Sequence, residues 1–467
     1  MTPGARLQAA IDLLIAIHSG ESPADRVSAA FFRERRYIGG GDRRDVIDRV
    51  YAVLRRRAAL DWWIGQAGAP SDRLRMIAAL ALIDGWTADR IAGSFDGGSY
   101  RPPPLDDNER RLAKTLEGKA LLSPDQPEWV RFEFPEWLTD NLHRLFGPRL
   151  EPEMGALRVE APLDLRVNTL KATREEAKVA LALDGVEAKP TALSPIGLRV
   201  QGRPPLAVLP TFKDGLVEVQ DEGSQLAALL VDARPGMRVV DFCAGAGGKT
   251  LAMAAAMENK GRIVACDVLQ GRVDRAATRL QRAGAHNVER RGLSSERDPW
   301  VKRHLGGYDR VLVDAPCTGV GTWRRNPDAK WKLTPAFLNE LIDLQKRILD
   351  SACRLVKPGG RLVYATCSLL PEENEGQIDG FLAQHQDFAV VPVAEVWRDS
   401  VGRHKDAAPC PSSDSYLRLT PAQHGTDGFF VAILQRSAAA KPAPETADAK
   451  PAPEAADAKP APEAADD

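Results

Sequence analysis

The chain contains 467 residues, of which 44% are hydrophobic and 27% are charged. This composition is typical of a soluble globular protein with two or three domains. The longest apolar stretches are far shorter than the roughly 20 residues of a membrane-spanning helix, and the first residues lack a signal-peptide pattern. We therefore expect a cytoplasmic protein without a membrane partner. The 6 cysteines are scattered and form no CxxC pair, which indicates neither a disulfide framework nor a metal site. We also expect a monomer.

The formal net charge of −1 is unevenly distributed. The last 27 residues repeat a nine-residue unit, KPAPEAADA or a close variant, and hold 3 Lys against 3 Glu and 4 Asp. Residues 1–60 hold 11 Arg against 7 acidic residues. Many of these arginines cluster, namely Arg33, Arg35, Arg36, Arg43, Arg44, Arg55, Arg56 and Arg57. The cluster is equally typical of a solvated helical face and of a surface that contacts phosphates.

Helical spacing of apolar residues dominates the first part of the chain, as in Val46, Val50 and Val53, and predicts an all-α domain over residues 1–125. Residues 126–235 contain strand candidates at 164–170 and 196–202, separated by a helix at 174–183. This pattern predicts a small α+β linking module. The repeat segment at 438–467 has no apolar residue except Ala, and we expect it to be disordered.

Apolar strands alternate with helices over residues 236–437. The expected strands lie at 237–243, 262–268, 308–317 and 361–368, and the expected helices lie at 248–260, 270–284 and in a long stretch ending at 357. This alternation predicts an α/β domain with a parallel sheet covered by helices. Two late strands, at 388–393 and 428–436, would complete the sheet. No helix precedes the second, which favours an antiparallel edge strand.

The loop DFCAGAGGKT, residues 241–250, follows the first strand of this domain. A phosphate-binding Walker A loop would need glycine at Cys243, although Lys249 fits and the apolar run ending at Asp314 resembles a Walker B strand. A dinucleotide fingerprint would need glycine at Thr250. The remaining interpretation is an S-adenosylmethionine site, in which Asp267, at the end of the next strand, binds the ribose hydroxyls. We favour this interpretation, and an NTPase remains the alternative.

Two cysteines follow later strands, in the sequences Asp-Ala-Pro-Cys317 and Thr-Cys367-Ser. Because the carboxyl ends of parallel strands share one edge of a sheet, Cys317, Cys367 and Asp314 should converge near the glycine loop. Two thiols suit methylation of cytosine at C5: one thiolate adds to C6, and a second acid–base group helps to remove the C5 proton. Asp314 is then the candidate for binding N3. The residues alone do not decide which cysteine attacks.

Several strings resemble the NOP/Sun family of RNA cytosine-5 methyltransferases, which includes the bacterial Fmu-type ribosomal RNA enzymes. They are VVDFCAGAGGKT, LVDAPCTGVGTWRRNPD, YATCSLLPEENE and HGTDGFF, with LDLRVNTLK and VEVQDEGSQL before them. The resemblance covers residues 125–436 and implies a Rossmann-like class I methyltransferase domain. The stretch FFRERRYIGGGDRRDVIDRVYAVLRR is similar to the NusB-like helical RNA-binding domain of Fmu-type members.

The resemblance implies that Cys367 is the nucleophile and that Cys317 assists release. It also implies a cofactor pocket for S-adenosylmethionine lined by Cys243, Ala244, Gly245, Ala246, Gly247, Gly248, Lys249, Asp267 and Asp314. The expected substrate is a structured RNA, ribosomal RNA first and transfer RNA as the alternative. The family's acidic residue for the adenine amino group is replaced here by Gly292 or Leu293, so this contact stays unassigned. Arg324 and Arg325 either hold the RNA backbone or are merely solvated. A non-catalytic RNA-binding assembly factor would be expected to lack a reactive cysteine or the glycine loop, and the sequence keeps both.

Overall fold

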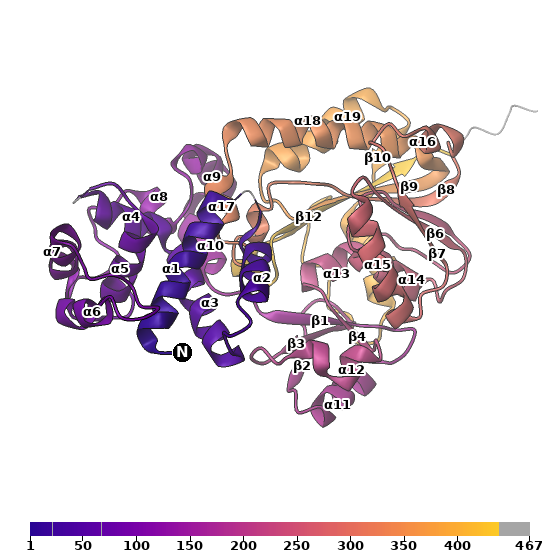
Figure 1. The fold of residues 1–467 in the computed structure, drawn as a ribbon. Coiled ribbons are helices and arrows are strands. Elements are labelled where there is room, and N and C mark those ends of the chain that lie inside the picture. Colours follow the sequence, from indigo (N-terminus) through magenta and orange to yellow (C-terminus); the bar gives the residue numbers. More distant parts are fainter. Residues whose placement is uncertain (21, 67, 439–467) are drawn as a thin grey trace, which may run out of the picture.

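The structure is a computed structural model that describes residues 1–20, 22–66 and 68–438. The predicted disordered tail, residue 438 aside, lies outside the described residues. The N-terminal part is helical (Figure 1), which agrees with the predicted all-α fold. Its helices are α1 (Pro3–Ser19), α2 (Ala24–Glu34), α3 (Gly40–Arg55), α4 (Arg57–Gly65), α5 (Asp72–Leu82), α6 (Ala88–Ser94) and α7 (Asp107–Leu116).

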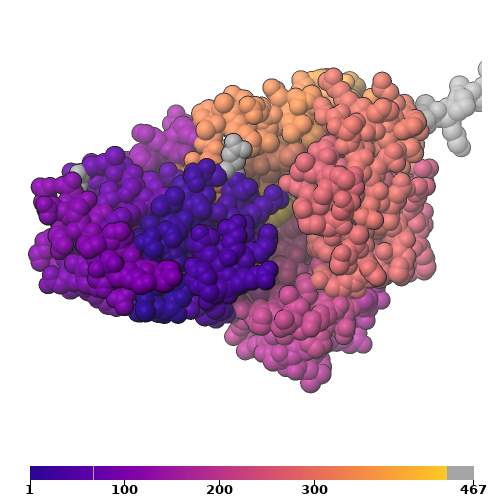
Figure 2. Space-filling model, in the orientation of Figure 1, coloured from indigo at the N-terminus to yellow at the C-terminus, as the bar shows by residue number. Residues whose placement is uncertain are grey.

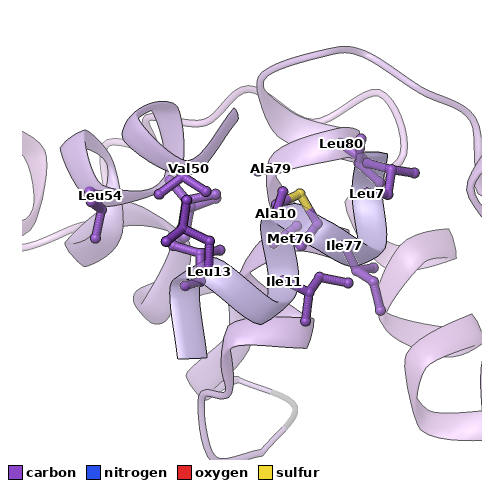
Figure 3. Close-up of a cluster of buried hydrophobic side chains, with 14 of the residues drawn as sticks. Leu7, Ala10, Ile11, Leu13, Val50, Leu54, Met76, Ile77, Ala79 and Leu80 are labelled. Carbon is purple, nitrogen blue, oxygen red and sulfur yellow. The ribbon is translucent and has the colours of Figure 1, made fainter. Parts of the chain in front are cut away.

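A single apolar cluster holds these helices together, and Figure 3 shows part of it. Leu7 and Leu14 of α1 are buried against Val50 of α3 and against Met76 and Leu80 of α5. These residues recur at helical spacing, so each helix turns one apolar face inward. The N-terminal helices therefore have a hydrophobic core of their own.

The next helices, α8 (Glu128–Phe132), α9 (Thr139–Phe146) and α10 (Leu150–Arg158), were not predicted. They are short and interrupted by prolines, so they carry little periodic signal. Their apolar residues pack against the C-terminal part of the chain: Phe134 and Leu142 share a buried cluster with Trp323 and Leu370. They therefore connect the N-terminal helices to the domain that follows.

A small antiparallel sheet comes next, in the strand order β2-β3-β1-β4. Strands β1 and β3 and helix α11 confirm the elements expected at 164–170, 196–202 and 174–183. Its elements are β1 (Leu163–Val167), α11 (Arg174–Leu183), β2 (Ala188–Pro190), β3 (Gly197–Val200), α12 (Pro210–Lys213) and β4 (Val217–Val219). Helix α13 (Glu222–Leu229) then leads into the larger sheet.

Within the described residues the larger sheet has eight strands, in the order β10-β12-β9-β8-β5-β6-β7, with β11 paired to β12. Strands β5 to β9 are parallel, whereas β10, β11 and β12 pair antiparallel. The strands are β5 (Arg238–Asp241), β6 (Arg262–Asp267), β7 (Val288–Gly292), β8 (Tyr308–Asp314), β9 (Val356–Thr366), β10 (Phe388–Val390), β11 (Leu417–Leu419) and β12 (Phe429–Arg436).

Helices cover both faces of this sheet, as the alternating pattern predicted. Helices α18 and α19 pack on one face, and α13, α14 and α20 pack on the other. The helices of this part are α14 (Gly248–Ala256), α15 (Gln270–Ala283), α16 (Pro299–Arg303), α17 (Ala329–Lys332), α18 (Pro335–Ala352), α19 (Glu375–Gln384), α20 (Val393–Asp399) and α21 (Pro421–His424). The expected Rossmann-like α/β architecture is thus confirmed.

Two details differ from the sequence-based expectation. Strand β12 is antiparallel as predicted, but it lies between β9 and β10, so β10 and not β12 is the edge strand. Strand β7 was not predicted at all. Its sequence, VERRG, is mostly charged because β7 forms the opposite edge of the sheet, where side chains remain partly exposed.

Candidate active site

The strand order reverses next to β5, whose neighbours are β6 on one side and β8 on the other. Ligands of open parallel sheets bind outside the carboxyl ends of the strands at such a switch point. Three strands end there in a carboxylate: Asp241 on β5, Asp267 on β6 and Asp314 on β8. The structure therefore brings together the strand ends that the sequence identified.

The glycine loop between β5 and α14 exposes backbone toward this switch point. Gly245 and Gly247 have φ of 56° and 81°, values in the left-handed region that favours glycine. No heavy atom lies within 4 Å of where a Cβ on Gly245 would stand, so a ligand can approach the main chain there. The amide of Ala244 donates to the Cys266 carbonyl at 2.8 Å, which fixes the loop against the end of β6.

Asp267 is buried, with 6% of its surface exposed, and two backbone amides orient its carboxylate. The amide of Gly245 donates to Oδ2 at 2.9 Å, and the amide of Leu269 donates to Oδ1 at 2.8 Å. Each carboxylate oxygen has about two lone-pair sites, so acceptors remain for a vicinal diol. The glycine cradle and this carboxylate fit the ribose and methionine parts of S-adenosylmethionine.

Gln270 fills the place where the adenine-binding acidic residue was expected. A Cβ built on Gly292 would lie 2.1 Å from Oε1 of Gln270, so a larger residue at 292 would collide with that side chain. The amide of Leu293 donates to the Asp267 carbonyl at 3.0 Å, which keeps this strand end beside Asp267. Where the family has an acidic side chain, this chain has Gly292, and the polar side chain of Gln270 occupies the space beside it.

Lys249, on the first turn of α14, is buried and binds Asp314. Its Nζ lies 2.7 Å from Oδ2 of Asp314 and 5.3 Å from the centre of the Phe429 ring. Burial alone would lower the lysine pKa, but the neighbouring Asp314 and Cys367 raise it, and the net shift is upward. Lys249 is thus a buried cation, which interacts favourably with a thiolate at Cys367.

Asp241 lies under the glycine loop and is fully buried. Burial raises its pKa to about 7, although its Oδ2 accepts a hydrogen bond from the Thr250 hydroxyl at 2.6 Å. Among the described residues its Oδ1 has no hydrogen-bond partner. The buried Asp241 carboxyl group therefore connects the end of β5 to Thr250 at the start of α14.

Cys317 and Cys367 meet at the ends of β8 and β9, with their Sγ atoms 3.5 Å apart. Both are free thiols and both are partly accessible. The hydrogen bond to Cys367 and burial raise the pKa of Cys317 well above its usual value. Burial also raises the pKa of Cys243 in the glycine loop. Cys317 is thus a protonated thiol that can donate to the sulfur of Cys367.

Glu373 and Asn374, on the turn after β9, hold the two cysteine loops, a role that was not predicted from the sequence. The Glu373 carboxylate is completely buried and accepts from the amide of Thr318 at 2.8 Å and from Gln345 at 2.9 Å. Asn374 donates to the Ser368 carbonyl at 3.1 Å. These bonds fix the residues that follow Cys317 and Cys367 in the chain.

Arg324 is buried and not solvated, and Arg325 is partly exposed; both are held in ion pairs with acidic residues of this chain. Nε of each arginine lies 2.5 Å from the Asp427 carboxylate, and Nη2 of Arg325 lies 2.9 Å from Asp221. Arg324 is 5% exposed. These long-range ion pairs join the residue before α13 to the loops before α17 and β12.

The described residues contain neither a metal-binding group nor a membrane-spanning helix. No group of three or more His, Cys, Asp or Glu side chains there is placed to hold a metal ion. No helix there is long and apolar enough to span a bilayer.

A parallel sheet with one inserted antiparallel strand, a glycine loop after β5 and a carboxylate after β6 define a Rossmann-like methyltransferase domain. Comparisons with known proteins agree. Residues 228–435 match the family "16S rRNA methyltransferase RsmB/F", and residues 134–207 match the ferredoxin-like domain of RsmF/B-like methyltransferases. The chain belongs to this family, and the resemblance predicted from the sequence is confirmed. The similarity of the N-terminal helices to NusB stays a prediction.

The relatives cover most of the chain. A probable ribosomal RNA small subunit methyltransferase B from Synechocystis is 33% identical over 417 residues, which are 85% of this chain and 92% of the relative. Ribosomal RNA small subunit methyltransferase B from Pectobacterium atrosepticum is 29% identical and aligns with 88% of this chain and 94% of its own length. These relatives support methyltransferase activity and not the NTPase alternative.

Solved structures share the architecture. The crystal structure of PH0851 is 28% identical, with a TM-score of 0.75, and covers 93% of this chain and 99% of its own. A methyltransferase homologue from Pyrococcus horikoshii is 30% identical, with a TM-score of 0.56, and covers 68% of this chain and 100% of its own.

Proposed function

We propose that this chain methylates C5 of a cytosine in small-subunit ribosomal RNA, with S-adenosylmethionine as methyl donor and a covalent bond between Cys367 and the base. One observation carries the proposal: the Sγ atoms of Cys317 and Cys367 lie 3.5 Å apart beside the cofactor-type strand ends. A methyltransferase whose substrate atom is already nucleophilic needs no thiol. Cytosine C5, in contrast, must first be activated by a covalent bond and must later lose its proton.

The first step activates the base. The Cys367 thiolate adds to C6, which makes C5 nucleophilic, and the negative charge that develops on the ring is met at N3. In this proposal Asp314 binds N3, and the Lys249 ammonium, whose Nζ lies 2.7 Å from Oδ2 of Asp314, supplies the proton for this step. The thiolate must approach the ring face, so the target base has to be single-stranded or extruded from its helix.

S-adenosylmethionine supplies an electrophilic methyl group when it is bound. On this chain the open backbone at Gly245 would hold its methionine part, and the Asp267 carboxylate would hold its ribose. After C5 has gained the methyl group, Cys317 gives its own proton to solvent and removes the C5 proton as a thiolate. The electrons of the C5–H bond form the C5–C6 double bond, and the C6–S bond breaks to release Cys367.

The pKa directions support this division of roles. Cys317 is a neutral thiol while its hydrogen bond to Cys367 raises its pKa. Once Cys367 is bonded to carbon it carries no negative charge, so this cause of the raised pKa disappears and Cys317 can act as a base. Cys367, in contrast, is the thiol that has the buried Lys249 cation beside it.

The test is to trap the covalent intermediate. A Cys317→Ala variant incubated with deproteinised 16S ribosomal RNA and S-adenosylmethionine should accumulate a protein–RNA adduct that survives denaturing electrophoresis. Cys367→Ala should form none, and Cys410→Ala, which changes a cysteine outside the site, should behave like the wild type. An adduct with Cys367→Ala but not with Cys317→Ala would reverse the roles. No adduct and no 5-methylcytosine with any variant or the wild type would refute the proposal.

A further inference from the structure

A cleft of about 930 Å³ lies where the N-terminal helices meet the linking module and the segment after Cys317. Figure 2 shows the surface hollowed between the N-terminal helices and the rest of the chain. Arginines outnumber acidic residues on its walls. The arginines are Arg43, Arg44, Arg55, Arg56, Arg158, Arg203, Arg324 and Arg325, and the acidic residues are Asp25, Asp48 and Glu160.

Most arginines on the N-terminal wall lack an ionic partner. Within the described part of the chain, no carboxylate lies within 4.0 Å of Arg43, Arg44, Arg55 or Arg56. Nearby arginines that do not line the cleft are paired: Arg6 of α1 and Arg49 of α3 with Asp45, and Arg57 of α4 with Asp61. An excess of cations along one concave wall raises the local concentration of anions, so this wall is suited to a polyanion.

The same wall is anchored to the segment that carries Cys317. Nη2 of Arg55 donates to the Arg324 carbonyl at 3.3 Å, and the amide of Ala24 donates to Asp328 at 3.1 Å. The indole of Trp331 donates to the Leu54 carbonyl at 3.4 Å. An anion in the cleft is thereby held at a fixed position relative to the loop of the two cysteines.

The distance between the cleft and the thiols is short. Arg324 is seven positions after Cys317 in the chain, so the two lie at most about 25 Å apart even if the chain were fully extended. One folded RNA can reach both places. A planar guanidinium binds phosphate oxygens in a bidentate way, as it does carboxylates. RNA is the polyanion that the proposed function brings next to the two thiols.

We propose that this cleft binds the phosphate backbone of the substrate RNA beside the target cytosine, with Arg44 and Arg56 as direct phosphate contacts. The inference rests on the proposed function for the identity of the polyanion. It assigns the binding surface to a junction of three parts of the chain and not to the N-terminal helices alone. The proposal also divides the arginines of residues 33–57. Arg44 and Arg56 contact RNA, whereas Arg33 and Arg36 are solvated.

The test compares two double variants that remove equal charge. Arg44→Gln with Arg56→Gln changes the cleft, and Arg33→Gln with Arg36→Gln changes two exposed arginines that do not line it. None of these four side chains makes a hydrogen bond or ion pair among the described residues, so both variants should fold. The probe is deproteinised 16S ribosomal RNA, and the dissociation constant is measured over a range of salt concentrations.

Each phosphate contact contributes roughly 0.7 to 0.9 to the slope of log K against log salt. The cleft variant should therefore lose about 1.5 units of slope and bind about 10- to 30-fold more weakly near 0.15 M salt. The control variant should stay within about twofold of the wild type, because exposed charges outside the cleft are screened. Equal losses in both variants, or no loss in the cleft variant, would overturn the proposal.

Failure of the two proposals can be told apart. Binding of S-adenosylhomocysteine to the cleft variant, measured by calorimetry, should equal that of the wild type. If the cleft variant weakens RNA binding as expected but the wild type forms no 5-methylcytosine, the cleft stands and the proposed reaction fails. If methylation occurs but both double variants bind RNA like the wild type, only the cleft is refuted.

Discussion

The Glu373 carboxylate accepts a hydrogen bond from the amide of Thr318 at 2.8 Å and thereby fixes the residue directly after Cys317. Glu373 is completely buried, and it also accepts from the Thr318 hydroxyl and from Gln345. Its own main chain accepts from the Tyr364 hydroxyl at 2.7 Å. The spacing of the two thiols thus depends on a buried acidic residue from a third segment of the chain.

We predict that Glu373→Ala lowers kcat about 10- to 100-fold with little change in the dissociation constant for S-adenosylhomocysteine. The substitution leaves buried donors without acceptors, which costs about 1–3 kcal/mol for each, and a shift of a reacting group by about 1 Å can cost about 100-fold in rate. Glu373→Gln keeps one acceptor oxygen for the Thr318 amide and should have a smaller effect.

The matched control is Glu372→Gln, because Glu372 stands on the same turn but accepts its hydrogen bond from Asn141. Single-turnover measurements of adduct formation and release would separate positioning from a purely structural role. Loss of stability in proportion to loss of rate, with both steps slowed equally, would contradict a positioning role for Glu373.

Asp267 provides the second prediction, on cofactor binding. Asp267→Ala removes the acceptor of the Gly245 amide and, with it, the acceptor that we propose for the ribose hydroxyls. Hydrogen bonds to charged groups contribute about 1.5–3 kcal/mol each, so we expect affinity for S-adenosylhomocysteine to fall about 100-fold or more. Isothermal titration calorimetry measures this directly. The control is Asp343→Ala, an exposed change on α18, which should bind S-adenosylhomocysteine like the wild type. Unchanged affinity of Asp267→Ala would contradict the proposal that Asp267 binds the ribose.

The parts of this fold that were predictable from sequence are those with a strong local signal. The strands that end at Asp241, Asp267 and Asp314 are apolar runs, and each is followed by turn or helix residues. Their carboxylates could be placed at one edge of the sheet because parallel strands share a direction. The convergence of Cys317 and Cys367 followed from the same rule.

The residues that hold this site together gave no local signal. Glu373 is buried although it follows another glutamate in a polar turn, and only its distant partners explain its burial. The ion pair of Arg325 with Asp221 joins residues 104 positions apart in the chain. Strand β7 was not predicted because the residues of an edge strand need not be apolar. Such features depend on tertiary contacts that periodicity does not encode.

The buried carboxyl group of Asp241 predicts a specific dependence of stability on pH. Burial raises its pKa to about 7 in the folded state, against about 3.9 in an unfolded chain. Between these values the unfolded carboxyl is ionised while the folded one keeps its proton, so the free energy of unfolding falls as pH rises. Above about pH 7 the loss is complete. Three pKa units correspond to about 4 kcal/mol at most.

Urea unfolding of the wild type and of Asp241→Asn at pH 4.5, 6 and 8 would measure this effect. Burial also raises the pKa of Glu133 to about 7, but that residue is present in both proteins and cancels in the difference. The stability of the wild type relative to Asp241→Asn should decrease from pH 4.5 to 8. A difference that stays constant over this range would mean that Asp241 titrates normally in the folded protein.

The buried ion pair between Arg324 and Asp427 gives the last prediction. Both side chains are almost completely buried, and Arg325 and Asp221 extend the pair into a network. Removing one partner leaves a buried charge without compensation, which typically costs about 3–5 kcal/mol. We therefore expect Asp427→Ala to destabilise the chain by about that amount in urea unfolding, whereas Asp414→Ala, which removes an exposed partner of Arg418, should cost less than about 1 kcal/mol. If Arg324 instead served RNA directly, Asp427→Ala would free it, and RNA would bind more tightly without loss of stability.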